Sequence, residues 1–527
     1  MLEVSEQNRI ISVKSFSEVS SDKLRGGFYT PSSLVEVCLN RIAELTHSRT
    51  NISILEPSIG DGAFLHALRE HPLSTKIRNL LGVEIAPSEA QKARAVGEES
   101  FFPVQILNQS VLEWAVETND YYDAVVGNPP FVRYQFISKT DLKNIGFLGE
   151  CMGIHFRGVS NLWIPVLLGA LNRLHVNGVM AIVVPAEIFT GLSAGDARSW
   201  LLENFAELQI DMFEPGSFPD VLQEVVIISG RKTHIHNQES SVKFIEHQSH
   251  NNIRIWFHHI PVKMSGWTRY LLTSNYISAL EEAYHLPSVV ALGKVAKLEV
   301  SIVTGANKFF TVTSDDVKTY NLSNWVEPLL PRIRHAEGLI YTEINHQVMD
   351  QLGIKAWLLD FNEDRPDPLK FPGASSYIKM GEDLELDTRY KTSIRYPWYR
   401  IPSIWSDKLL LSKRSHWYPR LVLNQANVLT TDTIYRGRML PSFEGREKEL
   451  IASFHNSLTL LTAEIEGRSF GGGVLELVPS EISRLRVSFS ACLGKNLEYL
   501  DNVARSCTAD LGSSGSAVGN ICSQESF

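Results

Sequence analysis

The stretch Asn-Pro-Pro-Phe at residues 128–131 constrains the fold more than any other part of this 527-residue chain. It follows the run from Asp123 to Gly127, whose β-branched and apolar residues predict a short buried strand. Pro129 and Pro130 have fixed φ angles and no N–H group to offer to a sheet, so they end the strand and stiffen the next loop. Ligands of open α/β sheets bind at the carboxyl ends of strands. The sequence therefore predicts a rigid ligand-binding loop here.

The side chains of this loop suit an amino group attached to an aromatic ring. The lone pair of such a nitrogen is delocalised into the ring, which makes the nitrogen a poor nucleophile. The Asn128 side chain and the Pro129 carbonyl can each accept one N–H and free the lone pair, while Phe131 stacks on the ring. The alternative is a plain strand-ending turn, because short motifs often match by chance.

Strand and helix patterns alternate around this loop. Ser32 or Ser33 is placed to cap a helix that carries apolar residues from Leu34 to Leu45 on one face. Alternating strands and helices indicate an α/β fold with a doubly wound sheet. The predicted strands lie near residues 52–56, 81–85, 104–108, 123–126, 178–185, 208–213 and 224–230, with a further helix over 161–172.

A glycine turn follows the first predicted strand, in the run Glu-Pro-Ser-Ile-Gly-Asp-Gly from Glu56 to Gly62. Glycines at this point let the backbone pass close to a ligand. The second predicted strand ends in Glu84, which is placed to accept hydrogen bonds from two ribose hydroxyls. This spacing favours a cofactor that carries adenosine. The dinucleotide fingerprint is not matched, because it needs a third glycine.

Residues 389–438 carry ten lysines and arginines against two aspartates, a net charge of +8 in a chain that nets −9. Aromatic residues are interleaved with these charges. Basic residues bind phosphates and aromatic residues stack on bases, so the segment predicts a nucleic-acid interface, with a solvated basic surface as the alternative. The residues expected to contact DNA are Arg395, Trp398, Tyr399, Arg400, Lys413, Arg414 and Arg420.

Other features of the sequence narrow the class of protein. The five cysteines are scattered and the histidines are dispersed, so neither a disulfide framework nor a metal site is expected. Residues 1–25 lack the apolar core of a signal peptide, and no apolar run reaches membrane length, so we expect a cytoplasmic protein without membrane contact. No nuclease core is evident, so no cleavage activity is expected.

These motifs, in this order, resemble the gamma class of S-adenosylmethionine-dependent DNA methyltransferases that modify the N6 amine of adenine. The likeness runs from about Gly26 to Lys232 and includes Thr30 before a helix, the glycine turn and Asn-Pro-Pro-aromatic. It implies a Rossmann-like, seven-stranded methyltransferase sheet over residues 26–240. It also implies a mixed α+β target-recognition domain over 241–505, after an N-terminal extension (1–25). From Ser506 on, serine, glycine and alanine dominate, which predicts a disordered tail (506–527).

The resemblance also implies partners and a role for each matching residue. S-adenosylmethionine would be the cofactor, and double-stranded DNA the partner of a monomeric bacterial or archaeal enzyme with a separate cognate restriction endonuclease. Asn128, Pro129, Pro130 and Phe131 would bind the target amine, with Phe218 as a second aromatic beside a flipped adenine. The implied cofactor-binding residues are Thr30, Glu56, Pro57, Gly60, Asp61, Gly62, Glu84, Ile85, Ser110 and Asn128.

One position departs from the family pattern. An acidic residue usually stands where Ser110 aligns, and it accepts a hydrogen bond from the amino group of the cofactor. A hydroxyl makes a weaker bond than a carboxylate, so either the cofactor binds more loosely or Glu113 takes over. On this basis Ser110→Asp is expected to tighten cofactor binding. Three alternative functions remain: cytosine-N4 methylation, glutamine methylation of a protein, and a non-catalytic DNA-binding specificity protein.

Overall fold

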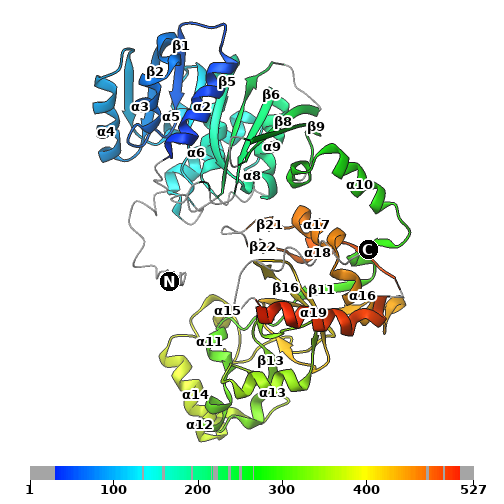
Figure 1. Ribbon diagram of the computed structural model, residues 1–527. Coiled ribbons are helices and arrows are strands. Elements are labelled where there is room, and N and C mark those ends of the chain that lie inside the picture. Colours follow the sequence, from blue (N-terminus) through cyan, green and yellow to red (C-terminus); the bar gives the residue numbers. More distant parts are fainter. Residues whose placement is uncertain are drawn as a thin grey trace, which may run out of the picture. The chain divides into compact units, whose positions relative to one another are not determined.

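The computed structural model describes most of the chain as two compact units, which divide between Ser274 and Asn275. Figure 1 shows the elements of both units. The described residues are 30–132, 136–156, 161–191, 194–214, 217, 224–234, 239–248, 252–264, 266–469, 474–490 and 493–510, the last four by backbone alone.

The first unit is built on a nine-stranded mixed sheet with the strand order β3-β2-β1-β4-β5-β7-β6-β8-β9. Strands β3, β2, β1, β4 and β5 are parallel, and β7 runs antiparallel to both β5 and β6. The strands are β1 (Ile52–Glu56), β2 (Ile77–Glu84), β3 (Val104–Asn108), β4 (Tyr122–Gly127), β5 (Leu174–Pro185), β6 (Phe205–Phe213), β7 (Val225–Lys232), β8 (Glu239–Gln248) and β9 (Asn252–Pro261).

The strand order reverses between β1 and β4, which pair directly. In a doubly wound sheet this switch point opens a crevice at the carboxyl ends of the strands, where ligands bind. Both the glycine turn after β1 and the Asn-Pro-Pro-Phe loop after β4 lie at this edge. The topology therefore brings together two motifs that are about seventy residues apart in the sequence.

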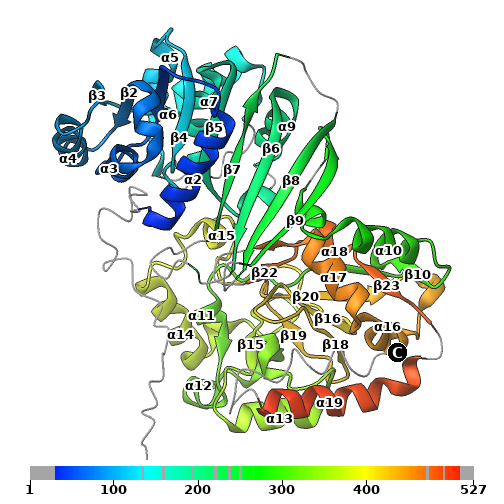
Figure 2. The same ribbon diagram turned by 45° about the horizontal axis from the view of Figure 1, so that its top comes forward.

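Helices cover both faces of this sheet, as Figure 2 shows from a second side. Helix α2 packs on α3 and on β4, β5 and β7, whereas α5 packs on α6 and α7. The helices of the first unit are α2 (Ser32–Leu45), α3 (Ala63–Glu70), α4 (Pro87–Glu98), α5 (Val111–Glu117), α6 (Lys139–Met152), α7 (Trp163–Asn172), α8 (Glu187–Thr190) and α9 (Gly195–Asn204).

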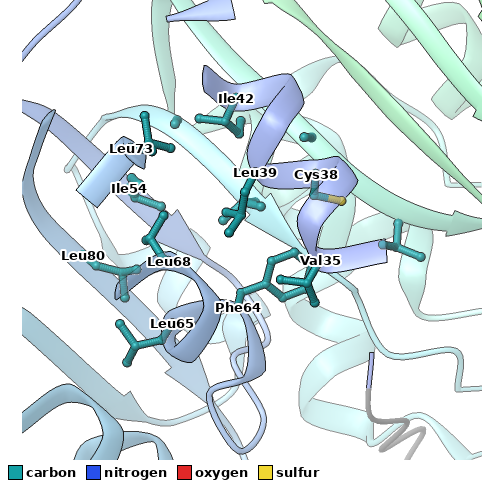
Figure 3. Close-up of a cluster of buried hydrophobic side chains, with 14 of the residues drawn as sticks. Val35, Cys38, Leu39, Ile42, Ile54, Phe64, Leu65, Leu68, Leu73 and Leu80 are labelled. Carbon is teal, nitrogen blue, oxygen red and sulfur yellow. The ribbon is translucent and has the colours of Figure 1, made fainter. Parts of the chain in front are cut away.

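A buried hydrophobic cluster joins α2 and α3 to the sheet (Figure 3). Leu39 of α2, Phe64 of α3 and Ile54 of β1 all belong to it. Side chains alternate between the two faces of a strand, and Ala124 and Val126 of β4 accordingly both point into this cluster. This packing fixes the start of α2, and with it Thr30, relative to the end of β4.

The expected fold class is confirmed, and the structure adds two strands to it. The segment around 242–267 is expected from its sequence to form short strands outside the sheet. Instead β8 pairs with β6 over six residues and with β9 over ten, so the sheet of the first unit extends past residue 240, where the catalytic domain was expected to end. The expected serine N-cap of α2 is also wrong, because Pro31 occupies that position and no side chain caps the helix.

The second unit is a mixed α+β assembly of small sheets with the orders β10-β23, β11-β20-β16-β18-β14, β12-β15-β13-β19 and β17-β22-β21. Its strands are β10 (Val289–Ala291), β11 (Ala296–Val300), β12 (Thr311–Val312), β13 (Val326–Leu330), β14 (Ile340–Tyr341), β15 (Trp357–Leu359), β16 (Leu409–Ser412), β17 (Arg414–Ser415), β18 (Leu421–Asn424), β19 (Leu429–Thr430), β20 (Ile434–Met439), β21 (Arg468–Ser469), β22 (Leu475–Glu476) and β23 (Arg486–Ser488).

Ten helices lie among these sheets or lead into them in the part of the chain that the structure describes. They are α10 (Ser274–Tyr284), α11 (Asn307–Phe310), α12 (Ser314–Thr319), α13 (Glu343–Gln351), α14 (Pro372–Asp383), α15 (Tyr390–Ser393), α16 (Glu447–Phe454), α17 (Ser457–Glu466), α18 (Pro479–Ile482) and α19 (Leu497–Asp510). Among all the described residues, no helix combines the length and the apolar character needed to span a membrane.

Candidate active site

The turn after β1 is shaped by two glycines with positive φ angles. Gly60 has φ of 57° and Gly62 has φ of 94°, and residues other than glycine rarely adopt such angles. The Ile59 N–H donates to the Val83 carbonyl at 3.0 Å, which holds the turn against the end of β2. The glycines therefore bring the backbone of residues 57–62 to the carboxyl edge of the sheet.

Glu84, at the end of β2, is fixed by this turn. One carboxylate oxygen accepts the Gly60 N–H at 3.0 Å and the other accepts the Ala86 N–H at 2.7 Å. A carboxylate offers about four lone-pair sites, so both oxygens keep capacity for a further donor. The next residue, Ile85, leaves 62% of its surface exposed at this edge. Glu84 therefore offers acceptors for the hydroxyls of a ligand, and Ile85 offers an apolar surface on which a flat ring can pack.

Glu56 is buried beneath the turn, and one of its carboxyl oxygens has no hydrogen-bond partner among the described residues. Burial raises the pKa of this carboxyl well above its ordinary value, and the charges of Asp61 and Glu84 raise the pKa further. Three acidic side chains thus lie close together at the carboxyl edge of β1 and β2. Such a cluster favours a ligand that carries positive charge.

Asn128 presents an acceptor without a donor. Its Nδ2 donates to Thr30 Oγ1 at 3.1 Å, which fixes the plane of the amide. The Oδ1 atom on the other side is buried and has no partner within the described part of the chain. A buried acceptor without a donor is costly, so this atom is set up to receive an N–H from a ligand.

The rest of the loop is held in place from behind. The Pro130 carbonyl accepts the Val132 N–H at 3.1 Å, and the Val132 carbonyl accepts the Leu162 N–H at 2.8 Å, beside the start of α7. Phe131 is half-buried and packs against the cluster beneath α2. The loop is therefore braced from the core and from α7. Phe218, the second aromatic expected at this site, lies outside the described residues.

Ser110, which follows β3, does not present a free hydroxyl. Its Oγ donates to Asp141 Oδ1 at 2.7 Å, and Ser138 Oγ donates to Asp141 Oδ2 at 2.7 Å. Asp141 lies in the first turn of α6 and keeps part of its surface exposed. This carboxylate cannot be predicted from local sequence patterns, because Ser110 and Asp141 are 31 residues apart and only the fold brings them together. The pattern Ser138-x-x-Asp141 at a helix start was a local signal, but for a cap rather than for this pair.

The strand end before Ser110 is tied to the strand end before Ile85. The Asn108 side chain donates to the carbonyls of Glu84 and Ile85 at 2.8 and 3.1 Å, which ties the end of β3 to the end of β2. Ser110 follows Asn108 by two residues. The Asp141 carboxylate that Ser110 binds is therefore linked through this short stretch to the strand end before Ile85. Glu113, the alternative acid, lies in the first turn of α5.

The expected DNA-binding residues of the second unit divide into two groups. Trp398 and Tyr399 are buried in a hydrophobic cluster, so their rings are not available for stacking on bases. Arg395 donates to the carbonyls of Val303 and Thr304, and burial lowers its pKa.

Arg420 belongs to the same group, because it donates to the carbonyls of Ile333 and Ala336 and burial lowers its pKa. The first group therefore anchors the fold: the rings of Trp398 and Tyr399 lie in the core, and the half-buried guanidinium groups of Arg395 and Arg420 are bound to backbone carbonyls. In the second group Arg414 is exposed, whereas Arg400 and Lys413 are half-buried, and all three form ion pairs. Arg400 pairs with Glu363, while Lys413 and Arg414 both pair with Glu476. Composition identified the basic segment but could not separate buried from exposed residues.

The sheet order is that of an α/β methyltransferase fold, and the glycine turn, the acid after β2 and the asparagine loop after β4 lie at its ligand-binding edge. Comparisons with known proteins agree. Residues 45–218 match the family described as Eco57I restriction-modification methylase, and residues 264–511 match the C-terminal domain of the Type II methyltransferase M.Eco57I. The chain belongs to this family of restriction-modification DNA methyltransferases.

Individual relatives are distant. The chain is 21% identical over 476 residues to the Type II methyltransferase M.AccI of Acinetobacter calcoaceticus, covering 87% of this chain and 84% of the relative. It is 24% identical over 265 residues to M.HincII of Haemophilus influenzae, covering 50% of this chain and 44% of the relative. Among solved structures, the Type IIL restriction-modification enzyme MmeI in complex with DNA superimposes with a TM-score of 0.56 at 14% identity, covering 95% of this chain and 73% of MmeI.

Proposed function

We propose that this protein transfers a methyl group from S-adenosylmethionine to the N6 amine of an adenine in double-stranded DNA. The observation that carries the proposal is the buried Asn128 Oδ1, which no donor among the described residues reaches, beside a loop stiffened by two prolines. One N–H of the target amine is bound by this oxygen and the other by the Pro129 carbonyl. These bonds localise the lone pair on the nitrogen, which is the polarisation that transfer needs.

The residues of the first unit fit the proposed methyl donor. S-adenosylmethionine carries a positive sulfonium, and the acidic side chains of Glu56, Asp61 and Glu84 favour that charge. Glu84 accepts from the ribose hydroxyls with its remaining lone pairs, and Ile85 packs on the adenine ring. Thr30, in the cofactor site, accepts a hydrogen bond from the amide of Asn128, in the target site, and this bond links the two sites.

Asp141 takes the role first considered for Ser110 or Glu113. We infer that its carboxylate accepts a hydrogen bond from the amino group of the cofactor, while Ser110 positions it through the 2.7 Å bond. A carboxylate makes a stronger hydrogen bond than a serine hydroxyl. The departure from the family pattern at position 110 is then compensated by a residue from another helix.

In the transfer step the amine nitrogen forms a bond to the methyl carbon while the sulfur–methyl bond breaks, leaving S-adenosylhomocysteine. The nitrogen then gives up one proton to water. An adenine stacked in a duplex cannot reach Asn128, so the target base must leave the helix. Phe131 is the aromatic surface on which the flipped base stacks.

Asn128→Ala tests this proposal, with Asn119→Ala as the matched control on an exposed loop before β4. With labelled S-adenosylmethionine and mixed-sequence duplex DNA, Asn128→Ala is expected to abolish transfer and to change cofactor binding by only a few-fold. Asn119→Ala is expected to behave as wild type. Loss of both transfer and cofactor binding in Asn128→Ala would instead give Asn128 a structural role.

The same assay separates the alternative functions. Label in N4-methylcytosine would keep the mechanism and change the acceptor. Label in a protein glutamine would move the substrate away from DNA. A protein that binds S-adenosylmethionine and DNA but transfers no label would be a non-catalytic specificity protein.

A further inference from the structure

Residues 389–396, here called the exposed segment, display large side chains that the fold does not use. The segment contains the short helix α15 and the residues after it, and α15 is labelled in both Figure 1 and Figure 2. Tyr390 is 78% exposed, Ile394 is 73% exposed and Tyr396 is 99% exposed. Single exposed apolar residues are common on protein surfaces, whereas large apolar patches mark interaction sites. Three such residues within seven positions make this segment a candidate for an interaction site.

The backbone of the exposed segment is tied to the core of the second unit. Thr392 is fully buried, and its hydroxyl donates to the carbonyls of Leu386 and Arg389. Arg395 donates to the Val303 and Thr304 carbonyls at 2.7 and 2.6 Å. The anchoring residues Thr392 and Arg395 therefore lie between the exposed apolar residues of the segment.

A glycine allows the segment to lie this close to its support. Gly305 has φ of 79°, and a Cβ atom there would lie 2.8 Å from the Cβ of Lys391. After the segment the chain enters the core, where the Trp398 ring is buried. A segment fixed at its middle and at its end can present side chains in a defined geometry, which a specific interaction requires.

The charges of the exposed segment indicate the chemistry of its partner. Arg389 and Lys391 are exposed, and residues 389–396 contain no acidic side chain. The Lys391 ammonium lies 5.8 Å from the centroid of the Tyr390 ring, so charge and aromatic surface are presented together. A partner that offers both anionic groups and flat apolar rings satisfies both features. Nucleic acid has this chemistry, in its phosphates and its bases.

We propose that the exposed segment is a wedge that inserts Tyr396 and Ile394 among the bases of duplex DNA, while Arg389 and Lys391 contact the flanking phosphates. Apolar and aromatic side chains that enter between base steps unstack them, and an unstacked base leaves the helix more easily. The wedge rests on the proposed function, because it gives the second unit a part in freeing the target base. It also replaces the buried Trp398 and Tyr399 as the aromatic contacts to DNA.

The test measures binding of a fluorescein-labelled pool of mixed-sequence duplex DNA by anisotropy at several salt concentrations. Tyr396→Ala is expected to weaken binding about tenfold, the effect of losing one stacked base, and Tyr396→Phe is expected to bind as wild type. The double variant Arg389→Gln with Lys391→Gln is expected to lower the slope of log affinity against log salt by about two. Tyr499→Ala, at a 62% exposed tyrosine of α19, is the matched control.

The outcomes distinguish the wedge from the function on which it rests. Wild-type protein that bound no duplex DNA would overturn the proposed function itself. Wild-type binding together with unchanged binding of Tyr396→Ala and of the double variant would overturn the wedge alone. Equal losses in Tyr396→Phe and Tyr396→Ala would also overturn it, because stacking needs the ring and not the hydroxyl. Melting temperatures equal to wild type in all variants confirm that folding is not the cause of a loss.

Discussion

Moving the carboxylate at the cofactor site is the sharpest perturbation that the structure suggests. Ser110→Asp was expected from the sequence to tighten binding of S-adenosylmethionine. The structure reverses this expectation, because Ser110 Oγ already lies 2.7 Å from Asp141 Oδ1. A second carboxylate in its place would face the first at nearly the same separation. Ser110→Asp is therefore expected to weaken cofactor binding and to destabilise the fold.

The size of the effect follows from the distance and the exposure. Two unit charges about 4 Å apart repel by about 1 kcal/mol in water and about 4 kcal/mol near a protein surface. Asp141 is partly exposed, so we take the lower end, about 1 kcal/mol. Asp141→Asn removes a charge-assisted hydrogen bond worth about 1.5 kcal/mol, which corresponds to about tenfold weaker cofactor binding.

Calorimetric titration with S-adenosylmethionine and with S-adenosylhomocysteine measures these changes. The double variant Ser110→Asp with Asp141→Asn is expected to recover most of the wild-type affinity, since it restores one carboxylate and one neutral neighbour. Ser138→Ala serves for comparison, because it removes the other hydrogen bond to Asp141 and the cap of α6 without adding a second carboxylate. Tighter binding by Ser110→Asp alone, or unchanged binding by Asp141→Asn, would refute the reasoning.

Three further predictions concern the two units separately. Glu84→Gln leaves one acceptor oxygen where two are needed and is expected to weaken cofactor binding about tenfold in the same titration; unchanged affinity would remove Glu84 from the site. Burial raises the pKa of Asp211, but hydrogen bonds from His247 and Arg41 outweigh burial and lower this pKa. The ionised Asp211 carboxylate therefore stabilises the fold above the ordinary aspartate pKa of about 3.9, and this stabilisation is lost as the pH falls below that value. Urea unfolding should show this acid loss in wild type and a smaller one in Asp211→Asn. Trp398→Ala is expected to destabilise the second unit by about 3 kcal/mol, and a DNA-binding defect with unchanged stability would contradict its core position.

Local patterns predicted much of the first unit. Apolar strands such as residues 104–108 and the glycine turn at 60–62 are marked by short-range sequence signals, and the structure places them as expected. Strands β8 and β9 were missed as members of the sheet, because exposed positions of β9, Ile253 among them, give the pattern of a peripheral strand.

Long-range pairs were beyond such patterns. Nothing local joins Ser110 to Asp141, and nothing local distinguishes the buried ring of Trp398 from the exposed ring of Tyr396 two residues earlier. Composition gives the charge and the aromatic content of a segment, whereas exposure depends on packing against residues distant in the sequence. The sequence could therefore indicate a nucleic-acid interface without identifying its contact residues.

The central claim is that Asn128 and its loop direct a methyl group to the N6 amine of adenine. Transfer of labelled methyl groups to mixed-sequence duplex DNA, followed by digestion and chromatography of the nucleosides, tests it most directly. Wild-type protein is expected to place label in N6-methyladenine, and Asn128→Ala is expected to place none. Label in any other nucleoside, or none in DNA from a protein that binds S-adenosylmethionine, would contradict it.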